Sequence, residues 1–276
     1  MIFSREHICI AALYLAAVAA PAQGLDCSPP AGSELVLRSG VVLLLGEVHG
    51  TREAPASIEA LACEALRRGL TVTVALELPV DETTAIHAYL RRSGLPSDRA
   101  RLLDGAFWRR NDGRSSLAML RLLDSLRQHV AAGRGVQVIL IEDPSSSEQR
   151  EQGMAAQVKA ALLQRPNDVH LVLTGNLHSR VSKGVPWDEA FEPMGYLLKR
   201  DLPSADIVAL ELVYTGGSAW NCTGPLPGDC GAHPVRGPKN QQAGITLFAA
   251  EGGAFSGRCS VGEASPSEPA RARGAV

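Results

Sequence analysis

Short apolar runs without alternating polar residues constrain the fold of this chain most strongly. The clearest of them is Val41-Val42-Leu43-Leu44-Leu45, and further strands are predicted at residues 71–78, 136–141, 169–174, 207–212 and 245–249. Because successive side chains of a strand point to opposite faces, such runs are typical of strands that are covered on both sides. Segments with helical periodicity separate most of them, at residues 54–68, 82–92, 115–132 and 148–164. The pattern predicts an α/β fold: a mostly parallel sheet with helices on both faces.

The N-terminus has the features of an export signal. Arg5 precedes an apolar run at residues 8–20, and Ala20-Pro21-Ala22 forms a small-x-small cleavage pattern. The run is too short to span a membrane. Asp26 stands before Cys27, where lipid attachment needs a small residue. We therefore expect a periplasmic or secreted protein that is soluble after cleavage and has no stable membrane anchor.

These boundaries divide the chain into three parts. Residues 1–22 are predicted to be the signal peptide, and residues 23–259 a single α/β domain. Residues 260–276 are rich in Ser, Pro, Ala and Arg and show no apolar periodicity, which predicts a disordered tail.

The cysteines fit an oxidising compartment. Five of the six remain after signal cleavage, so at least one is free. A bridge between Cys222 and Cys230 would close a Gly/Pro-rich loop, and Cys27 with Cys259 is the expected second pair. Cys63 lies within an apolar helical pattern and is expected to be buried as a small hydrophobic residue. The spacing does not prove this connectivity.

Charge and missing motifs exclude several functions. The chain has 27 Lys+Arg and 29 Asp+Glu residues, which argues against a nucleic-acid-binding surface. It contains no Gly-x-Ser-x-Gly, His-Glu-x-x-His, Walker or Gly-x-Gly-x-x-Gly motif. Serine hydrolases, zincins and nucleotide-binding enzymes are therefore disfavoured.

Polar residues stand where the apolar runs end. Two runs end in the same frame, Gly-x-x-His, which places His49 and His178 after strands; Glu47 and Glu77 accompany them. Because the carboxyl ends of parallel strands share one rim, these four residues are the predicted catalytic group. They could hold a divalent metal or act as acid and base. The structural alternative is that each histidine caps a helix or satisfies a buried carbonyl.

Four further residues are candidates for contacting a substrate. Arg52 and Asn176 lie in or beside the two histidine motifs. Trp108 and Arg114 lie in a polar loop before a predicted helix, and such loops often carry binding residues. The alternative for this loop is structural, with Asp112 or Ser115 serving as a helix N-cap.

Residues 38–215 resemble a superfamily that includes erythromycin esterases, Tiki/TraB proteins and ChaN-like haem-binding proteins. The resemblance rests on the two Gly-x-x-His motifs and on Glu77. It implies an α/β fold with a polar cleft at the carboxyl ends of the strands. From the Tiki proteins it implies His49, Glu77 and His178 as metal ligands or acid and base groups. From the esterases it implies a histidine-activated water.

Three functional hypotheses follow. The first is a hydrolase of an ester or amide bond, with His49 as general base, helped by Glu47, and with His178 and Glu77 binding a metal or stabilising an oxyanion. The second is a haem- or metal-binding protein without turnover. The third is an inactive member with a structural role. The ligand would be a small molecule, a peptide or haem, the cofactor a divalent metal or haem, and the oligomeric state stays open.

Overall fold

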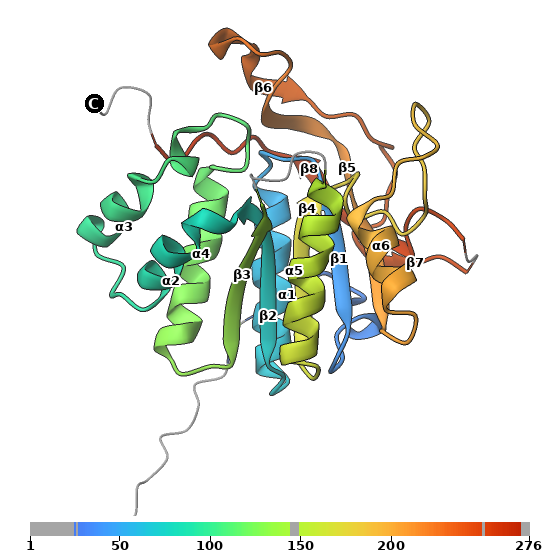
Figure 1. The fold of residues 1–276 in the computed structure, drawn as a ribbon. Helices are drawn as coiled ribbons and strands as arrows, with labels where there is room; N and C mark the ends of the chain where they lie inside the picture. The colour runs from blue at the N-terminus through green and yellow to red at the C-terminus, as the bar shows by residue number, and fades with distance from the viewer. Residues whose placement is uncertain (1–24, 26, 144–148, 250–251, 272–276) are drawn as a thin grey trace, which may run out of the picture.

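The computed structural model describes residues 25, 27–143, 149–249 and 252–271, and a mixed sheet forms its centre (Figure 1). The strand order is β3-β2-β4-β1-β5-β8-β7, and β6 pairs with β5 beside this path. The strands are β1 Val42–Glu47, β2 Val72–Pro79, β3 Val136–Glu142, β4 Val169–Gly175, β5 Ile207–Cys222, β6 Cys230–Pro234, β7 Gly244–Leu247 and β8 Gly257–Ala264. Only β6 and β7 pair antiparallel to their neighbours among the described strands. The predicted fold class is confirmed.

Helices cover both faces of the sheet. The helices are α1 Glu53–Arg67, α2 Thr83–Leu90, α3 Pro96–Leu103, α4 Leu117–Ala131, α5 Arg150–Gln164 and α6 Met194–Asp201. Leu43 and Leu45 of β1 belong to the apolar core with α1, α2 and α4. Val42 and Leu44 belong to a second core with α5 and α6. All of β1 is buried, which explains why its residues do not alternate in polarity.

The prediction of a disordered tail from residue 260 is wrong for its first half. Strand β8 continues to Ala264 between β5 and β7. Beyond it, the Ser267 amide donates to the Gly50 carbonyl at 2.8 Å, and the Ser267 hydroxyl accepts from the Ala118 amide at 2.9 Å. Serine hydroxyls and backbone amides order this segment, which is why apolar periodicity does not mark it. We call residues 265–270 the C-terminal strap.

Several short elements were not expected from the sequence. These are helices α3 and α6, with eight residues each, and strands β6 and β8, for which no strand was predicted. The predicted signal peptide lies outside the described residues. Within the part of the chain that the structure describes, no helix is long and apolar enough to cross a membrane.

The disulfides partly match the prediction. Cys222 and Cys230 are bonded, as expected. Cys27 bonds to Cys63 and not to Cys259, because the segment before the first strand lies against helix α1. Cys259 is a buried free thiol, and burial raises its pKa to about 12. Two disulfides are compatible with an exported protein.

Removing the Cys27–Cys63 bridge is expected to cost more stability than removing the Cys222–Cys230 bridge. The two bridges have sequence separations of 36 and 8, so the first restricts the unfolded chain more. We expect losses in the unfolding free energy of about 4 and about 2.5 kcal/mol for the two Cys→Ser double variants. Urea unfolding measures both, and equal or reversed losses would contradict the entropic explanation.

Candidate functional site

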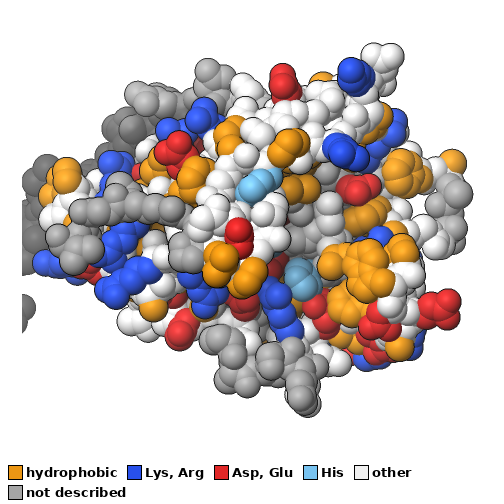
Figure 2. All heavy atoms as spheres, turned by 90° about the horizontal axis from the view of Figure 1, so that it is seen from above, with side chains coloured by type: hydrophobic (Ala, Val, Ile, Leu, Met, Phe, Trp, Pro, Cys, Tyr) orange, Lys and Arg blue, Asp and Glu red, His pale blue; other side chains and the backbone are white. Residues whose placement is uncertain are grey.

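The two Gly-x-x-His turns bring His49 and His178 to the same rim of the sheet. Strands β1 and β4 are parallel neighbours, with Glu47 opposite Gly175. A Cβ atom on Gly175 would lie 3.1 Å from Nε2 of His49, so glycine leaves the room that this imidazole fills. Figure 2 views this end from above and shows histidine, acidic and basic side chains near its centre.

His49 is held between two carboxylates. Its Nδ1 lies 2.9 Å from Oε1 of Glu47, and its Nε2 lies 3.6 Å from Oε2 of Glu77. Both glutamates are buried, whereas the His49 side chain is 25% exposed. A ligand can therefore reach the imidazole but not the carboxylate that orients it.

His178 has the same arrangement with a different glutamate. Its Nδ1 lies 2.6 Å from Oε1 of Glu151, and its Nε2 lies 3.7 Å from Oε1 of Glu77. The second oxygen of Glu151 accepts a hydrogen bond from the Met194 amide at 2.8 Å, so the carboxylate is fixed at both ends. The sequence analysis missed Glu151. The available signal was its place near the start of a helix that follows a strand ending at the rim.

Glu77 lies between the two imidazoles and is surrounded by hydrogen-bond donors. It accepts from the Gly175 amide at 2.7 Å and from Arg150 at 2.6 Å, and Arg114 is 3.4 Å away. Both arginines also bind Glu142, at 2.8 and 2.9 Å. Arg150, like Glu142, was not among the predicted site residues, because only the fold brings these side chains to Glu77.

The charges of the site are strongly coupled. Burial opposes a charge on His49, but the Glu77 carboxylate and the hydrogen bonds to Glu47 and Glu77 outweigh it and raise the pKa of His49 to about 10. Burial also opposes the charge on Glu77, yet His49, His178 and Arg114 lower the pKa of Glu77 well below its usual range. Burial raises the pKa of Glu47. His49 is thus protonated at neutral pH, beside an ionised Glu77.

The four predicted substrate contacts have different locations. Arg114 belongs to the site and is fixed by Asp112 at 2.7 Å. The prediction for Trp108 is wrong, because its ring is fully buried in the core. Arg52 is exposed, and its Nε donates to the Pro266 carbonyl at 3.1 Å. Asn176 follows β4, and its backbone amide donates to the backbone carbonyl of Glu47 at 3.0 Å.

The predicted N-cap of the helix that follows this loop, α4, was also wrong. Ser116, and not Asp112 or Ser115, is the N-cap, since its hydroxyl accepts from the Met119 amide. Ser115 donates to the Arg110 carbonyl instead.

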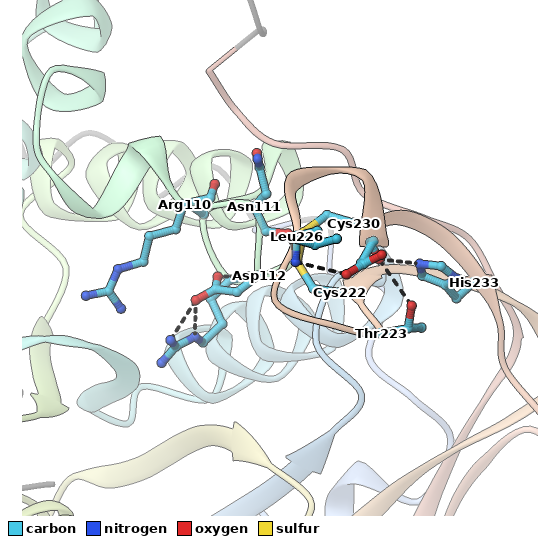
Figure 3. Close-up of a disulfide and its surroundings, with 11 residues drawn as sticks. Arg110, Asn111, Asp112, Cys222, Thr223, Leu226, Cys230 and His233 are labelled. Carbon is cyan, nitrogen blue, oxygen red and sulfur yellow. Dashed lines mark hydrogen bonds and ion pairs between the residues drawn. A yellow bond between two sulfur atoms is a disulfide. The ribbon is translucent and has the colours of Figure 1, made fainter.

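The β5–β6 hairpin supports the loops that carry His49 and Arg114. Figure 3 shows its disulfide beside residues 110–112, with Cys222 Sγ 3.3 Å from the Asn111 carbonyl oxygen. Lower in the hairpin, the Trp220 amide donates to the Gly50 carbonyl at 2.9 Å. Gly113 has a positive φ of 86°, and a Cβ there would lie 2.5 Å from the Trp220 oxygen. The loop can approach the hairpin this closely only with glycine.

The residues present do not fit a divalent metal. Among the described residues, no group of three or more His, Cys, Asp or Glu side chains is arranged to hold one. The Glu77 carboxylate is already bound by a guanidinium group and a backbone amide, and a cation there would meet Arg114 and Arg150. The Nε2 atoms of both imidazoles, which a haem iron would need as ligands, lie 3.6 and 3.7 Å from Glu77 oxygens.

Comparison with known proteins supports the fold. The sequence matches no protein-family model and no curated protein. An erythromycin esterase mutant in its open conformation has a similar structure, with a TM-score of 0.65 and 12% identity over 85% of this chain and 93% of the esterase. A succinoglycan biosynthesis protein has a TM-score of 0.64 and 9% identity over 86% of this chain and 91% of that protein. A haem-binding ChaN of Campylobacter jejuni has a TM-score of 0.40 and 14% identity over 66% of this chain and 85% of that protein. The first two structures share the predicted α/β fold, and at these identities the likeness shows the fold alone.

Proposed function

We propose that this protein is a hydrolase that cleaves an ester or amide bond with two histidines and without a metal. One observation carries the proposal: each imidazole has its Nδ1 on a carboxylate, buried Glu47 or the 12% exposed Glu151, and its Nε2 3.6 or 3.7 Å from a Glu77 oxygen. The two Nε2 atoms thereby lie on either side of the same carboxylate group, beside Oε2 and Oε1 of Glu77. This arrangement suits a water and a carbonyl group held between an acid and a base.

The electrostatics favour a division of roles. Because His49 carries a proton up to a pKa of about 10, it cannot take one from water at neutral pH. His178 is then the base: Glu151 accepts its Nδ1 proton, which leaves the Nε2 lone pair free. This reverses the roles expected from the sequence, in which His49 was the base. Protonated His49 instead stabilises negative charge on the carbonyl oxygen.

The reaction balances with these groups alone. His178 Nε2 takes a proton from water, and the water oxygen forms a bond to the carbonyl carbon. The carbonyl electron pair moves to oxygen, beside protonated His49. When the tetrahedral intermediate collapses, the bond to the leaving group breaks, and His178 gives that group the proton. Both imidazoles return to their starting states, and the products are an acid and an alcohol or amine.

Chromogenic esters and anilides provide the direct test. We expect purified protein to hydrolyse members of a p-nitrophenyl ester and p-nitroanilide panel, with turnover unchanged after chelation by EDTA. The appropriate control is protein carrying both His49→Ala and His178→Ala. Absence of hydrolysis across the panel, or activity that chelation removes, would contradict the proposal.

Glu151→Gln tests the role of the carboxylate on His178. The glutamine amide can donate to Nδ1, which would favour the tautomer with its proton on Nε2 and so block the base. A wrong tautomer lowers turnover strongly in comparable sites, so we expect kcat to fall about 100-fold or more, with KM little changed. Glu151→Asp should recover part of the rate, and Glu189→Gln, at an exposed position, should keep it. Loss of kcat in Glu189→Gln, or none in Glu151→Gln, would contradict this role.

A further inference from the structure

A cleft of about 470 Å³ opens beside His178, and its lining combines polar and apolar residues. The polar residues include Arg150, Glu151 and Gln152 at the start of α5. The apolar residues are Leu177, Ala190 and Phe191. Because His178 itself lines the cleft, whatever fills it lies next to the proposed base.

The charged groups of the cleft already have partners. Arg150 binds Glu77 and Glu142, and both oxygens of Glu151 are occupied by His178 and the Met194 amide. Glu192, which also lines the cleft, pairs with Lys183 at 2.9 Å and with Arg200 at 3.1 Å. A ligand carboxylate at Arg150 would compete with Glu77 and Glu142 and would meet the Glu151 and Glu192 carboxylates, whereas a neutral apolar group disturbs none of these pairs.

Ala190 and Phe191 belong to a tightly hydrogen-bonded loop. The Gly184 amide donates to the Phe191 carbonyl at 2.8 Å, and Val185 and Asp188 exchange backbone hydrogen bonds at 2.9 and 3.0 Å. In the same loop Trp187 is 74% exposed, and Leu177, which lines the cleft, is 40% exposed. Ordered apolar side chains kept in water beside a polar site are typical of a ligand-binding surface.

We infer that this cleft binds the acyl portion of the substrate and selects esters or amides of neutral, apolar acids. This inference rests on the proposed function. The chain of the acid would lie on Leu177 and Phe191, which places its carbonyl group next to His178. The gain comes from removing methylene groups from water.

A series of p-nitrophenyl esters measures this selection. From acetate through butyrate to octanoate, we expect kcat/KM to rise by about 10-fold or more, because each buried methylene adds a favourable transfer free energy. Phe191→Ser and Leu177→Ser should flatten this rise, mainly through KM. Leu163→Ser is the matched control, because Leu163 is 67% exposed near the far end of α5. A rise that Phe191→Ser and Leu177→Ser leave intact would overturn the inference.

A binding measurement separates this inference from the proposed function. The neutral fluorophore N-phenyl-1-naphthylamine should bind the native protein and His49→Ala equally, and Phe191→Ser about 10-fold more weakly. If no ester or anilide is hydrolysed but this pattern holds, the hydrolase proposal fails and the cleft remains an apolar ligand site. If esters are hydrolysed without preference for longer acids, and Phe191→Ser binds the dye as the native protein does, the hydrolase stands and the inference fails.

Discussion

Replacing His49 with alanine is expected to lower kcat/KM by about 10²–10⁴-fold, the contribution typical of a positioned acid or base. The variant removes the imidazolium that faces the carbonyl oxygen, and it leaves Glu77 ionised between Arg114 and Arg150. Steady-state hydrolysis of the best ester measures the loss. Far-UV circular dichroism should remain native, because His49 packs at the rim and not in either apolar core. His233→Ala, in the β5–β6 hairpin, is the matched control and should keep full activity.

The pH profile distinguishes the two roles that His49 could have. If protonated His49 stabilises the oxyanion, activity should persist above neutral pH and fall as the pH rises through about 10. If His49 were the base, activity would instead rise over that range. An alkaline rise that disappears in His49→Ala would therefore restore the roles expected from the sequence.

Glu77→Gln is expected to destabilise the protein by about 3–5 kcal/mol, the usual cost of removing one partner from a buried ion pair. Glu77 is 4% exposed, and the change leaves Arg150 and His49 each without one of two carboxylate partners. Urea unfolding at neutral pH measures the loss. Glu64→Gln is the matched control, because Glu64 is equally buried beside Arg67 and Arg68 but lies on α1, outside the site. It should cost less, since Arg67 is 52% exposed and Glu64 has no histidine ion pair among the residues that the structure describes, and it should not change activity.

The same coupling sets the pH dependence of stability. His49 has a folded pKa of about 10 against an ordinary value of 6.5, so its stabilising contribution is complete below pH 6.5 and is lost as the pH rises toward 10. Glu77 has a lowered pKa, so its contribution is present above pH 4.5 and is lost in acid. Unfolding measured from pH 6 to 10 should show a decline in the native protein that is much smaller in Glu77→Gln. Parallel declines would contradict the coupling.

Local sequence signals predicted the residues at the strand ends of the site, but not the carboxylate that binds His178. Apolar runs and their polar ends were sufficient to place Glu47, His49, Glu77 and His178 at one rim, because parallel strands share their carboxyl edge. Glu151 lies on a helix, and its partner His178 is 27 residues away, so no local pattern joins them. The prediction that Trp108 contacts a substrate was wrong because a local pattern was misleading. An aromatic residue in a polar loop resembles a surface contact, but the short turn at Phe107–Arg109 buries it.

The C-terminal strap has a consequence for how this protein is made. It joins two segments that are distant in sequence: the Ser265 carbonyl accepts from the Arg52 amide, and at residues 115–117 the Glu268 carbonyl accepts from the Leu117 amide while the Ala270 amide donates to the Ser115 carbonyl. The loops that follow His49 and Arg114 therefore reach their final positions only after residues 265–270 have left the ribosome. Every catalytic group proposed above is translated long before that point. A nascent chain can form the central strands as it emerges, but the strap can hold these loops in place only after its own residues have emerged.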